Sequence, residues 1–467
     1  MTQRIHLIGI SGSGLSAIAQ VLLERGYTVS GSDRMLGPLA HELARMGAQV
    51  FEGHHAEQVQ GADLVIRSSA IPDDNPEVQA ARAAGIPVLK RADFLAQLMA
   101  GQSVIAVGGT HGKTTTTAMV AWLLTRLGQD PSYIIGGVSR NLGGNAHAGH
   151  GPTFVIEADE YDRMFLGLDP SWIILTYLEH DHPDCYPTLA DYRQAFHDFV
   201  HRLQPGGGLL ACGDCAETAA LVKQVPEGCH AWTYGINFPC TTTGYRAADV
   251  SSNASGGTSF KAWYSSAGQP DLLLAQVDLQ IPGLHNVQNA LAALALVHRL
   301  GLPVEPAAAA LAEFSGTGRR FELLGEAKGV AIYSDYAHHP TEIRATLAAA
   351  RQRYPGRRIW AVWQPHTYSR TQTLFDEFTQ AFHDADRVIV TEIYAARETD
   401  PGFSSNKIVA AMTHQNVKYA QTLIAATRLL LDELRPGDVV FVLSAGDADQ
   451  ISQQVLESLS FGEQHHE

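Results

Sequence analysis

Short apolar runs of strand length alternate with amphipathic stretches of helix length along most of the chain. Near the N-terminus, residues 5–10 (IHLIGI) precede a helical pattern at residues 15–25, and residues 27–33 (YTVSGSD) form the next apolar run. Alternation of strands and helices is typical of α/β domains built on mostly parallel sheets. The pattern therefore predicts an α/β protein.

The same alternation continues in two further series. The apolar runs of the second series are residues 133–135, 154–156, 172–175, 209–211 and 230–234, and those of the third are 330–334, 359–363, 387–391 and 439–443. From about residue 237 to residue 283, Thr, Ser and Gly alternate with apolar residues, which indicates a small antiparallel addition. Because 467 residues are too many for one core, we expect three domains, at residues 1–100, 101–314 and 315–467.

A phosphate-binding loop is predicted within residues 103–117 (SVIAVGGTHGKTTTT). An apolar run meets a Gly-rich turn there, and Lys113 and Thr114 begin a helical pattern, which is the setting of a nucleoside triphosphate site. Backbone amides after Gly109 would hold phosphate oxygens, Lys113 would reach the outer phosphates, and Thr114 would bind Mg²⁺. Val107 stands where the strict motif has glycine, so a Gly-rich turn with one solvated lysine is the alternative.

Another glycine-rich turn follows the first apolar run. Gly9, Gly12 and Gly14 have the spacing GxxGxG, and Asp33 lies about 20 residues further on, where dinucleotide-binding folds place an acid that contacts the ribose. The spacing differs from the nicotinamide motif GxGxxG, so we expect a nucleotide diphosphate at the helix N-terminus instead. A tight turn with glycines for close packing is the alternative.

Carboxylates and imidazoles follow two apolar runs of the second series, with Glu157 after one run and His182 after the other. The carboxyl ends of parallel strands meet at one edge of a sheet, and Mg²⁺ prefers oxygen ligands. We therefore expect Thr114, Glu157 and His182 to hold Mg²⁺. The alternatives for His180, His182 and Cys185 are a zinc site and a solvated loop.

Polar groups also follow the later apolar runs, and Asn286 and Asn289 lie three residues apart at a predicted helix start. The two amides would either cap that helix or read an adenine edge. Arginines and other polar groups follow the apolar runs of the third series, so we expect them to lie in one cleft and to bind anions there. Arginine suits this role because it pairs with carboxylates and phosphates bidentately. The segments concerned are GRRF (318–321), SDYAHHPT (334–341) and QPHTYSRT (364–371).

Charge and cysteine content narrow the function classes. A formal net charge of −15 argues against a nucleic-acid partner, because such binding needs many Lys and Arg residues. Five cysteines are an odd number, so no disulfide framework is expected, and the CxxC pair Cys212 and Cys215 has no second pair at zinc spacing. The sequence has neither a signal segment nor an apolar stretch that would span a bilayer, so we expect a cytoplasmic protein with no membrane partner.

The chain resembles the Mur ligase family over nearly its whole length. The motifs that carry the resemblance are, in order, GxxGxGLSAIA, SSAI, GTHGKTTTT, EADE, DHPD, HNVQNA, GRRFE, YAHHPTEI and QPHTYSRT. The resemblance implies a Rossmann-like N-terminal domain for a UDP-sugar, a central P-loop ATPase domain and a Rossmann-like C-terminal domain. It also implies a ligase of peptidoglycan synthesis that uses ATP and Mg²⁺ to join L-alanine to UDP-N-acetylmuramate through an acyl phosphate. We expect a monomer or homodimer.

Matching positions imply roles for individual residues. The UDP moiety would contact Gly12, Gly14, Asp33 and Ser69. The ATP phosphates would contact Gly109, Thr110, His111, Gly112, Lys113, Thr114 and Thr115, and the rest of the nucleotide would contact Asn286, Arg320 and Asp335. Tyr336, His338 and Arg370 would lie near the amino acid, and the catalytic groups would be Lys113, His338 and Arg370.

Two departures from the family pattern concern the substrate. Relatives that add later amino acids usually carry a carbamylated lysine where this chain has Phe196, which favours the branch that adds alanine. Thr367 stands where many relatives have arginine, so the expected alanine pocket has one cation fewer. The alternative functions are a ligase that joins a preformed tripeptide to the same UDP-sugar and a nucleotide-binding regulatory module without ligase activity.

Overall fold

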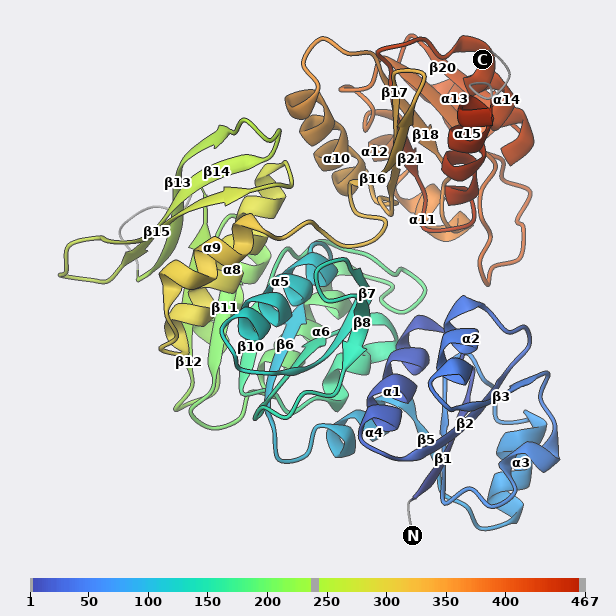
Figure 1. Cartoon of the computed structure of the whole chain (residues 1–467), viewed down its shortest axis with the longest axis vertical. Coiled ribbons are helices and arrows are strands. Elements are labelled where there is room, and N and C mark those ends of the chain that lie inside the picture. Colours follow the sequence, from blue (N-terminus) through green and yellow to red (C-terminus); the bar gives the residue numbers. More distant parts are fainter. Residues whose placement is uncertain (1–2, 237–242, 462–467) are drawn as a thin grey trace.

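The computed structural model describes residues 3–236 and 243–461, so Cys240 and the beginning of the expected antiparallel addition lie outside the described residues. The strands form three sheets. Figure 1 shows the N-terminal part in blue and the C-terminal part in orange and red, at separate edges of the central part. The predicted three-part α/β architecture is confirmed.

The N-terminal sheet has five parallel strands in the order β3-β2-β1-β4-β5, which corresponds to the first five strands of the dinucleotide-binding order 3-2-1-4-5-6. These strands are β1 (Arg4–Ile8), β2 (Thr28–Asp33), β3 (Gln49–Glu52), β4 (Leu64–Arg67) and β5 (Val88–Lys90). The helices are α1 (Ser13–Glu24), α2 (Pro38–Arg45), η1 (Ala56–Val59), α3 (Pro76–Ala83) and α4 (Arg91–Leu98). This order places the loops after β2, β1 and β4 next to one another.

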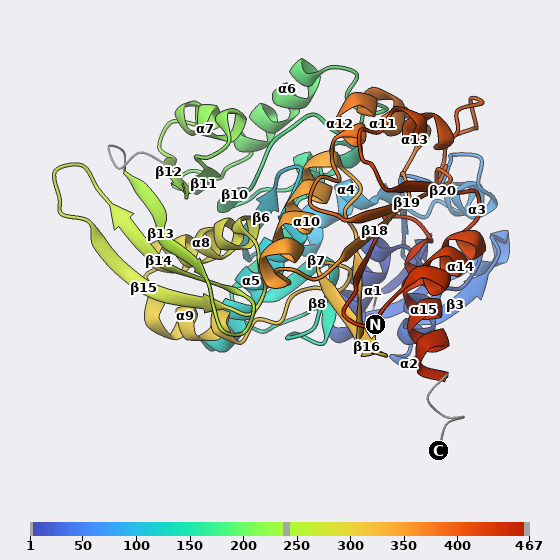
Figure 2. The same cartoon turned by 90° about the horizontal axis from the view of Figure 1, so that it is seen from above.

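The central sheet has ten strands in the order β15-β14-β13-β12-β11-β10-β6-β9-β7-β8. They are β6 (Ser103–Gly108), β7 (Ser132–Ser139), β8 (Gly144–His147), β9 (Thr153–Glu157), β10 (Trp172–Leu175), β11 (Gly208–Cys212), β12 (His230–Gly235), β13 (Gly244–Ser252), β14 (Thr258–Ser265) and β15 (Leu272–Leu279). The expected antiparallel addition is confirmed, because β14 runs antiparallel to both β13 and β15. Figures 1 and 2 show these strands at the outer end of the sheet.

Helices cover both faces of the central sheet. They are α5 (Lys113–Arg126), η2 (Tyr161–Gly167), α6 (Leu189–Val200), α7 (Ala216–Leu221), η3 (Val222–Gln224), α8 (Leu284–Arg299) and α9 (Val304–Ala312). Successive side chains of β6 enter different cores, with Val104 and Ala106 in one buried cluster and Ile105 and Val107 in another. A strand that is buried on both faces reads as a continuous apolar run, which is why the sequence revealed it.

The C-terminal sheet has six strands in the order β16-β17-β21-β18-β19-β20, and only β16 is antiparallel to its neighbour. They are β16 (Glu322–Ala327), β17 (Val330–Asp335), β18 (Ile359–Trp363), β19 (Arg387–Thr391), β20 (Val417–Ala420) and β21 (Val439–Leu443). The helices are α10 (Pro340–Arg353), α11 (Tyr368–Thr373), α12 (Phe375–Thr379), α13 (Asn406–Ala411), α14 (Leu423–Glu433) and α15 (Asp449–Phe461). None of the helices within the described ranges has the length and apolar character needed to cross a membrane.

The N-terminal and central sheets share one hydrophobic cluster. It contains Leu15 and Ile18 of α1 together with Phe154 and Ile156 of β9. The expected domain boundary near residue 101 falls between α4 and β6, and apolar packing crosses it. These two parts of the chain are therefore held together by burial of apolar surface.

A buried polar network lies in the N-terminal part. The Glu77 carboxylate on α3 is fully buried, lies 2.9 Å from His6 Nε2 and 2.7 Å from His54 Nδ1, and accepts a hydrogen bond from Ser32 Oγ at 2.6 Å. Burial alone would raise the pKa of Glu77, but hydrogen bonds from His6 and Ser32 outweigh burial and lower that pKa. The carboxylate is therefore charged in the folded protein at neutral pH.

Replacing Glu77 by alanine should lower the free energy of unfolding by about 3 kcal/mol, because His6 would stay buried without its partner. Since the pKa of Glu77 is depressed in the folded state, its stabilising charge is present above the ordinary carboxyl pKa of about 4.3 and is lost as the pH falls further. Urea unfolding at several pH values measures both effects, with replacement of the exposed Glu57 as control. Equal stability of Glu77→Ala and wild type at neutral pH would contradict the prediction.

Candidate active site

The loop between β6 and α5 has the backbone of a phosphate-binding loop; we call residues 109–115 the P-loop. Gly109 has φ +131°, and a Cβ atom there would lie 2.3 Å from the Thr176 hydroxyl. Gly112 has φ +81°, and a Cβ atom there would lie 2.7 Å from Asn289 Oδ1. Glycine is therefore required at both positions. Of the two amides between them, that of Thr110 donates to the Tyr177 carbonyl at 2.6 Å.

Lys113, at the start of α5, has a side chain that is only 14% exposed. Its Nζ lies 2.9 Å from Glu160 Oε2 and donates a hydrogen bond to the Gly109 carbonyl at 2.6 Å. Burial opposes the charge of Lys113, but Glu160 and Glu157 outweigh burial and raise the pKa of this ammonium above its ordinary value. The alternative of a solvated lysine is therefore wrong.

The Thr114 hydroxyl and the Glu157 carboxylate lie side by side at the end of β6 and β9. Thr114 Oγ1 donates to Glu157 Oε1 at 3.1 Å, and the Gly136 amide donates to Glu157 Oε2 at 2.7 Å. A Cβ atom on Gly136 would lie 2.4 Å from the carboxylate, so glycine is required for this approach. Burial raises the pKa of Glu157 despite the nearby Lys113, and a bound cation would favour the ionised form.

His182 reaches the same group of acids from the loop after β10. Its Nε2 lies 3.3 Å from Glu160 Oε1, the carboxylate that also pairs with Lys113. His180 instead contacts the Tyr186 carbonyl at 2.7 Å. In residues 3–236 and 243–461, the donor atoms of His180, His182 and Cys185 do not come together, so the zinc alternative is wrong.

The donor set at this edge fits Mg²⁺. One hydroxyl, one carboxylate and one imidazole from Thr114, Glu157 and His182 leave positions for water and phosphate oxygens, which Mg²⁺ usually retains. Thr114 contacts Glu157 directly, whereas His182 is connected to them through Glu160 and Lys113. The structure thus brings the two oxygen donors together and places the imidazole beside the next carboxylate.

A cavity of about 280 Å³ adjoins the P-loop. The predicted ATP contacts that line it are His111, Gly112, Thr114, Thr115, Asn286, Arg320 and Asp335. Gly109, Thr110 and Lys113 lie beside it in the same loop. Asn286 donates to the Pro282 carbonyl, and no side chain caps α8, so the capping alternative for Asn286 and Asn289 is wrong.

Arg370 from α11 contacts the central part of the chain. Its Nε lies 2.9 Å and its Nη2 2.8 Å from Asp181 Oδ1, and both side chains are buried. Burial opposes ionisation of Asp181, but Arg370 outweighs burial and holds the pKa of that carboxyl well below its usual range. The remaining guanidinium nitrogen, Nη1, lies 3.0 Å from His366 Nδ1.

His338 and Tyr336 follow β17 on the same side. Burial lowers the pKa of His338 to about 3, so the imidazole is neutral at physiological pH. Its Nδ1 lies 2.9 Å from the Tyr336 carbonyl and 3.2 Å from Glu342 Oε2, and both neighbours are acceptors. Nδ1 therefore carries the hydrogen and Nε2 is left as an acceptor. The Tyr336 ring packs against the guanidinium of Arg320.

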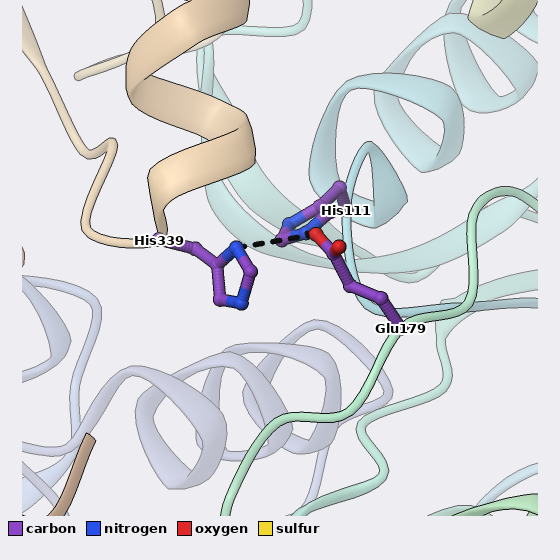
Figure 3. A group of neighbouring side chains, drawn as sticks. All are labelled: His111, Glu179 and His339. Atoms are coloured by element: carbon purple, nitrogen blue, oxygen red, sulfur yellow. Dashed lines mark hydrogen bonds and ion pairs between the residues drawn. The ribbon is translucent and has the colours of Figure 1, made fainter. Parts of the chain in front are cut away.

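The P-loop residue His111 lies between two carboxylates. Its Nε2 is hydrogen-bonded to Glu179, and its Nδ1 lies 3.1 Å from Glu342 Oε1. Figure 3 shows His339 approaching Glu179 from the other side, with Nδ1 3.1 Å from Oε1. The donor atoms of His111, Glu179 and His339 all lie within 4.8 Å of one another, a spacing that a cation could bridge. A hydrogen bond joins His111 to Glu179, and the contact of Glu179 with His339 connects the central and C-terminal parts.

The predicted UDP contacts lie on neighbouring loops of the N-terminal sheet. Gly12 and Gly14 are at the start of α1, and Ser69 follows β4, the strand next to β1. Asp33 accepts hydrogen bonds from the Ser11 amide at 2.9 Å and the Arg34 amide at 2.8 Å, so this carboxylate also folds the glycine turn. The edge of this sheet thus gathers the four predicted residues.

Several groups beside these sites were not among the predicted residues. Arg91 Nη1 would lie 2.0 Å from a Cβ atom on Gly14, which puts a cation at the N-terminus of α1. Glu160, Asp181, Glu179 and Glu342 each contact a predicted site residue. Three of these acids follow predicted strands, in the segments EADE (157–160) and LEHDH (178–182). The sequence did not distinguish acids that contact the site from acids that are exposed to solvent.

Family models match most of the chain. One described as "Mur ligase family, catalytic domain" matches residues 4–103, the "Mur ligase middle domain" matches residues 107–297, and the "Mur ligase, glutamate ligase domain" matches residues 319–446. A UDP-N-acetylmuramate–L-alanine ligase from Chloroflexus aggregans is 43% identical, over 97% of this chain and 98% of the relative. The corresponding ligase from Acidithiobacillus ferrooxidans is 42% identical, over 97% of each chain.

Solved structures agree with these matches. A UDP-N-acetylmuramate–alanine ligase from Thermotoga maritima is similar with a TM-score of 0.80 and 29% identity, over 97% of this chain and 98% of that one. A murein peptide ligase from Psychrobacter arcticus is similar with a TM-score of 0.72 and 27% identity, over 98% of each chain. With three family models in order and a relative above 40% identity over nearly its full length, this chain belongs to the Mur ligase family.

Proposed function

We propose that this chain is an ATP-dependent ligase that joins L-alanine to the carboxylate of UDP-N-acetylmuramate in peptidoglycan precursor synthesis. The observation that carries the proposal is the cavity at which P-loop residues of the central part meet Arg320 and Asp335 of the C-terminal part. Identity of 43% to a ligase of this name over 97% of the chain supports the same reaction. As a protein of this biosynthetic step, it would act in the cytoplasm.

The proposed chemistry brings two anions together. The muramoyl carboxylate takes the γ-phosphoryl group of ATP to form an acyl phosphate, the L-alanine amine attacks its carbonyl carbon, and phosphate leaves. Positioning and charge neutralisation dominate phosphoryl transfer. Lys113 would exchange its contact with Glu160 for phosphate oxygens, and Arg320 would add a second cation at the cavity wall.

The other residues hold the ion and the amine. Thr114, Glu157 and His182 would hold Mg²⁺, which neutralises phosphate charge when bound. The Nε2 atom of the neutral His338 would accept a hydrogen bond from the L-alanine amine, since Nδ1 already donates a hydrogen bond. Arg370 would meet the amino-acid carboxylate with the N–H groups that Asp181 and His366 leave free. The glycine turn, Asp33 and Ser69 would hold the UDP moiety, with Arg91 beside its diphosphate.

The proposal predicts that ADP forms only when UDP-N-acetylmuramate and L-alanine are both present. A coupled assay for ADP with each substrate omitted in turn measures this dependence. Equal ADP release without either substrate would refute the ligase, and nucleotide binding without turnover would favour the regulatory module. Reduction of a nicotinamide cofactor would contradict our expectation that the first glycine turn binds a nucleotide diphosphate instead.

The nearest alternative is the ligase that uses a preformed tripeptide. It deserves a direct comparison because a murein peptide ligase shares this fold with a TM-score of 0.72. Matched assays with L-alanine and with the tripeptide separate the two functions, and a higher kcat/KM for the tripeptide would replace our proposal. The higher TM-score of 0.80 with an alanine ligase and the fully buried Phe196 favour L-alanine.

A further inference from the structure

Glu342 lies in the first turn of α10 with its side chain only 10% exposed, and it lines the proposed ATP cavity. Part of its role is local, because its Oε2 accepts a hydrogen bond from the His338 amide at 3.1 Å and lies 3.4 Å from the His339 amide. These contacts belong to a capping box, in which either Glu or Gln serves at this position. The helix start therefore needs the shape of the side chain but not its charge.

Three side chains of the proposed site surround the same carboxylate. His111 Nδ1 lies 3.1 Å away, His338 Nδ1 3.2 Å away and Arg320 Nη1 3.5 Å away. His111 belongs to the P-loop, Arg320 precedes β16, and His338 follows β17. One acid thus contacts a group from the phosphate site, a group from the nucleotide cavity and a group from the amino-acid site.

The charges of this cluster are complementary. Both nitrogens of His111 face carboxylates, and although burial lowers its pKa, Glu179 and Glu342 raise that pKa to about 9. Burial opposes ionisation of Glu342, but His338 and His111 outweigh burial and hold its pKa well below the usual range. His111 and Arg320 both contact Glu342 Oε1, so loss of the carboxylate charge would leave these two cations without the negative charge that they share.

We propose that Glu342 is a positioning residue that fixes the P-loop and the amino-acid site relative to each other. One change at this residue then weakens the binding of both ATP and L-alanine. The proposal rests on the ligase function proposed above. Glu342 acts through His111, Arg320 and His338, and it does not need to touch a reacting atom.

The test variant is Glu342→Gln, which keeps the capping shape and removes the charge. We expect KM for ATP and KM for L-alanine each to rise about 10-fold, and kcat to fall about 10-fold, because small misplacements of positioning groups carry large kinetic costs. The matched control is Asp438→Asn. Asp438 is a buried carboxylate that immediately precedes β21 and pairs with Arg358 at 2.6 Å, at the opposite strand ends of the C-terminal sheet from the site. The control should lose stability with unchanged KM values.

A double-mutant cycle tests the contact between the two parts of the chain. If Glu342 acts through His111, then His111→Asn and Glu342→Gln together should raise KM for ATP by less than the product of the single effects. A full product would overturn the proposal, as would a Glu342→Gln enzyme with both KM values unchanged. If Glu342→Gln does not fold, Glu342→Asp retains the charge at a shorter reach and should raise both KM values together; a rise in only one overturns the proposal.

The wild-type control separates the two levels of inference. Failure of the wild type to form ADP with UDP-N-acetylmuramate and L-alanine would refute the proposed function. An active wild type with an unaffected Glu342→Gln variant would refute only the role of Glu342.

Discussion

Lys113→Ala should lower kcat by at least about 10³-fold, because the variant lacks the cation that would neutralise the transferring phosphoryl group. Lys113 is the ammonium of the P-loop, and its largely buried Nζ lies 2.9 Å from Glu160 Oε2. The measurement is ADP formation under saturating substrates, with circular dichroism and thermal unfolding to show that the fold persists.

Lys407→Ala is the matched control for Lys113→Ala, since Lys407 is an exposed lysine on α13. It should turn over at the wild-type rate. A Lys113→Ala enzyme within a few-fold of wild type would remove the P-loop from the mechanism. Glu160 keeps its contact with His182 in the variant, so we expect a folded protein with an inactive site.

Glu157→Ala should raise the Mg²⁺ concentration for half-maximal activity by at least about 10-fold and should also lower kcat. The variant loses the carboxylate that Thr114 and Gly136 hold at the proposed ion site. Activity titrated with Mg²⁺ after removal of bound metal by EDTA measures the effect. Replacement of the exposed Glu305 should leave the titration unchanged, and an unchanged titration of Glu157→Ala would exclude this carboxylate as a ligand.

Buried parallel strands were the most predictable part of the fold. The predicted runs at residues 172–175, 359–363, 387–391 and 439–443 coincide with β10, β18, β19 and β21. Side chains on both faces of these strands are buried, so each reads as an unbroken apolar run. The strands that the sequence did not reveal are β3, β8, β16 and β20, and all four lie at sheet edges. Edge strands have one neighbour and mixed polar sequences, so their pattern is weak.

In the site, too, features set by neighbouring residues were predictable and contacts between distant residues were not. The P-loop was recognisable because its residues are contiguous and each has a local reason, such as the positive φ of Gly109 and Gly112. The contact of His111 with Glu342 joins positions 231 residues apart, and its existence depends on how two sheets pack. No spacing rule within one segment predicts such a pair, which is why the acids around the site were missed.

The central sheet contacts the N-terminal sheet and the C-terminal sheet through different kinds of side chains. The contact with the N-terminal sheet is apolar, so separating them would expose hydrocarbon surface at about 25 cal/mol per Å². In the described ranges, no hydrophobic cluster spans the central and C-terminal sheets, and charged groups such as Arg370 and Asp181 meet there instead. Water can replace those partners, so separating the C-terminal sheet from the central sheet would expose charged groups that water can solvate, and little hydrocarbon surface.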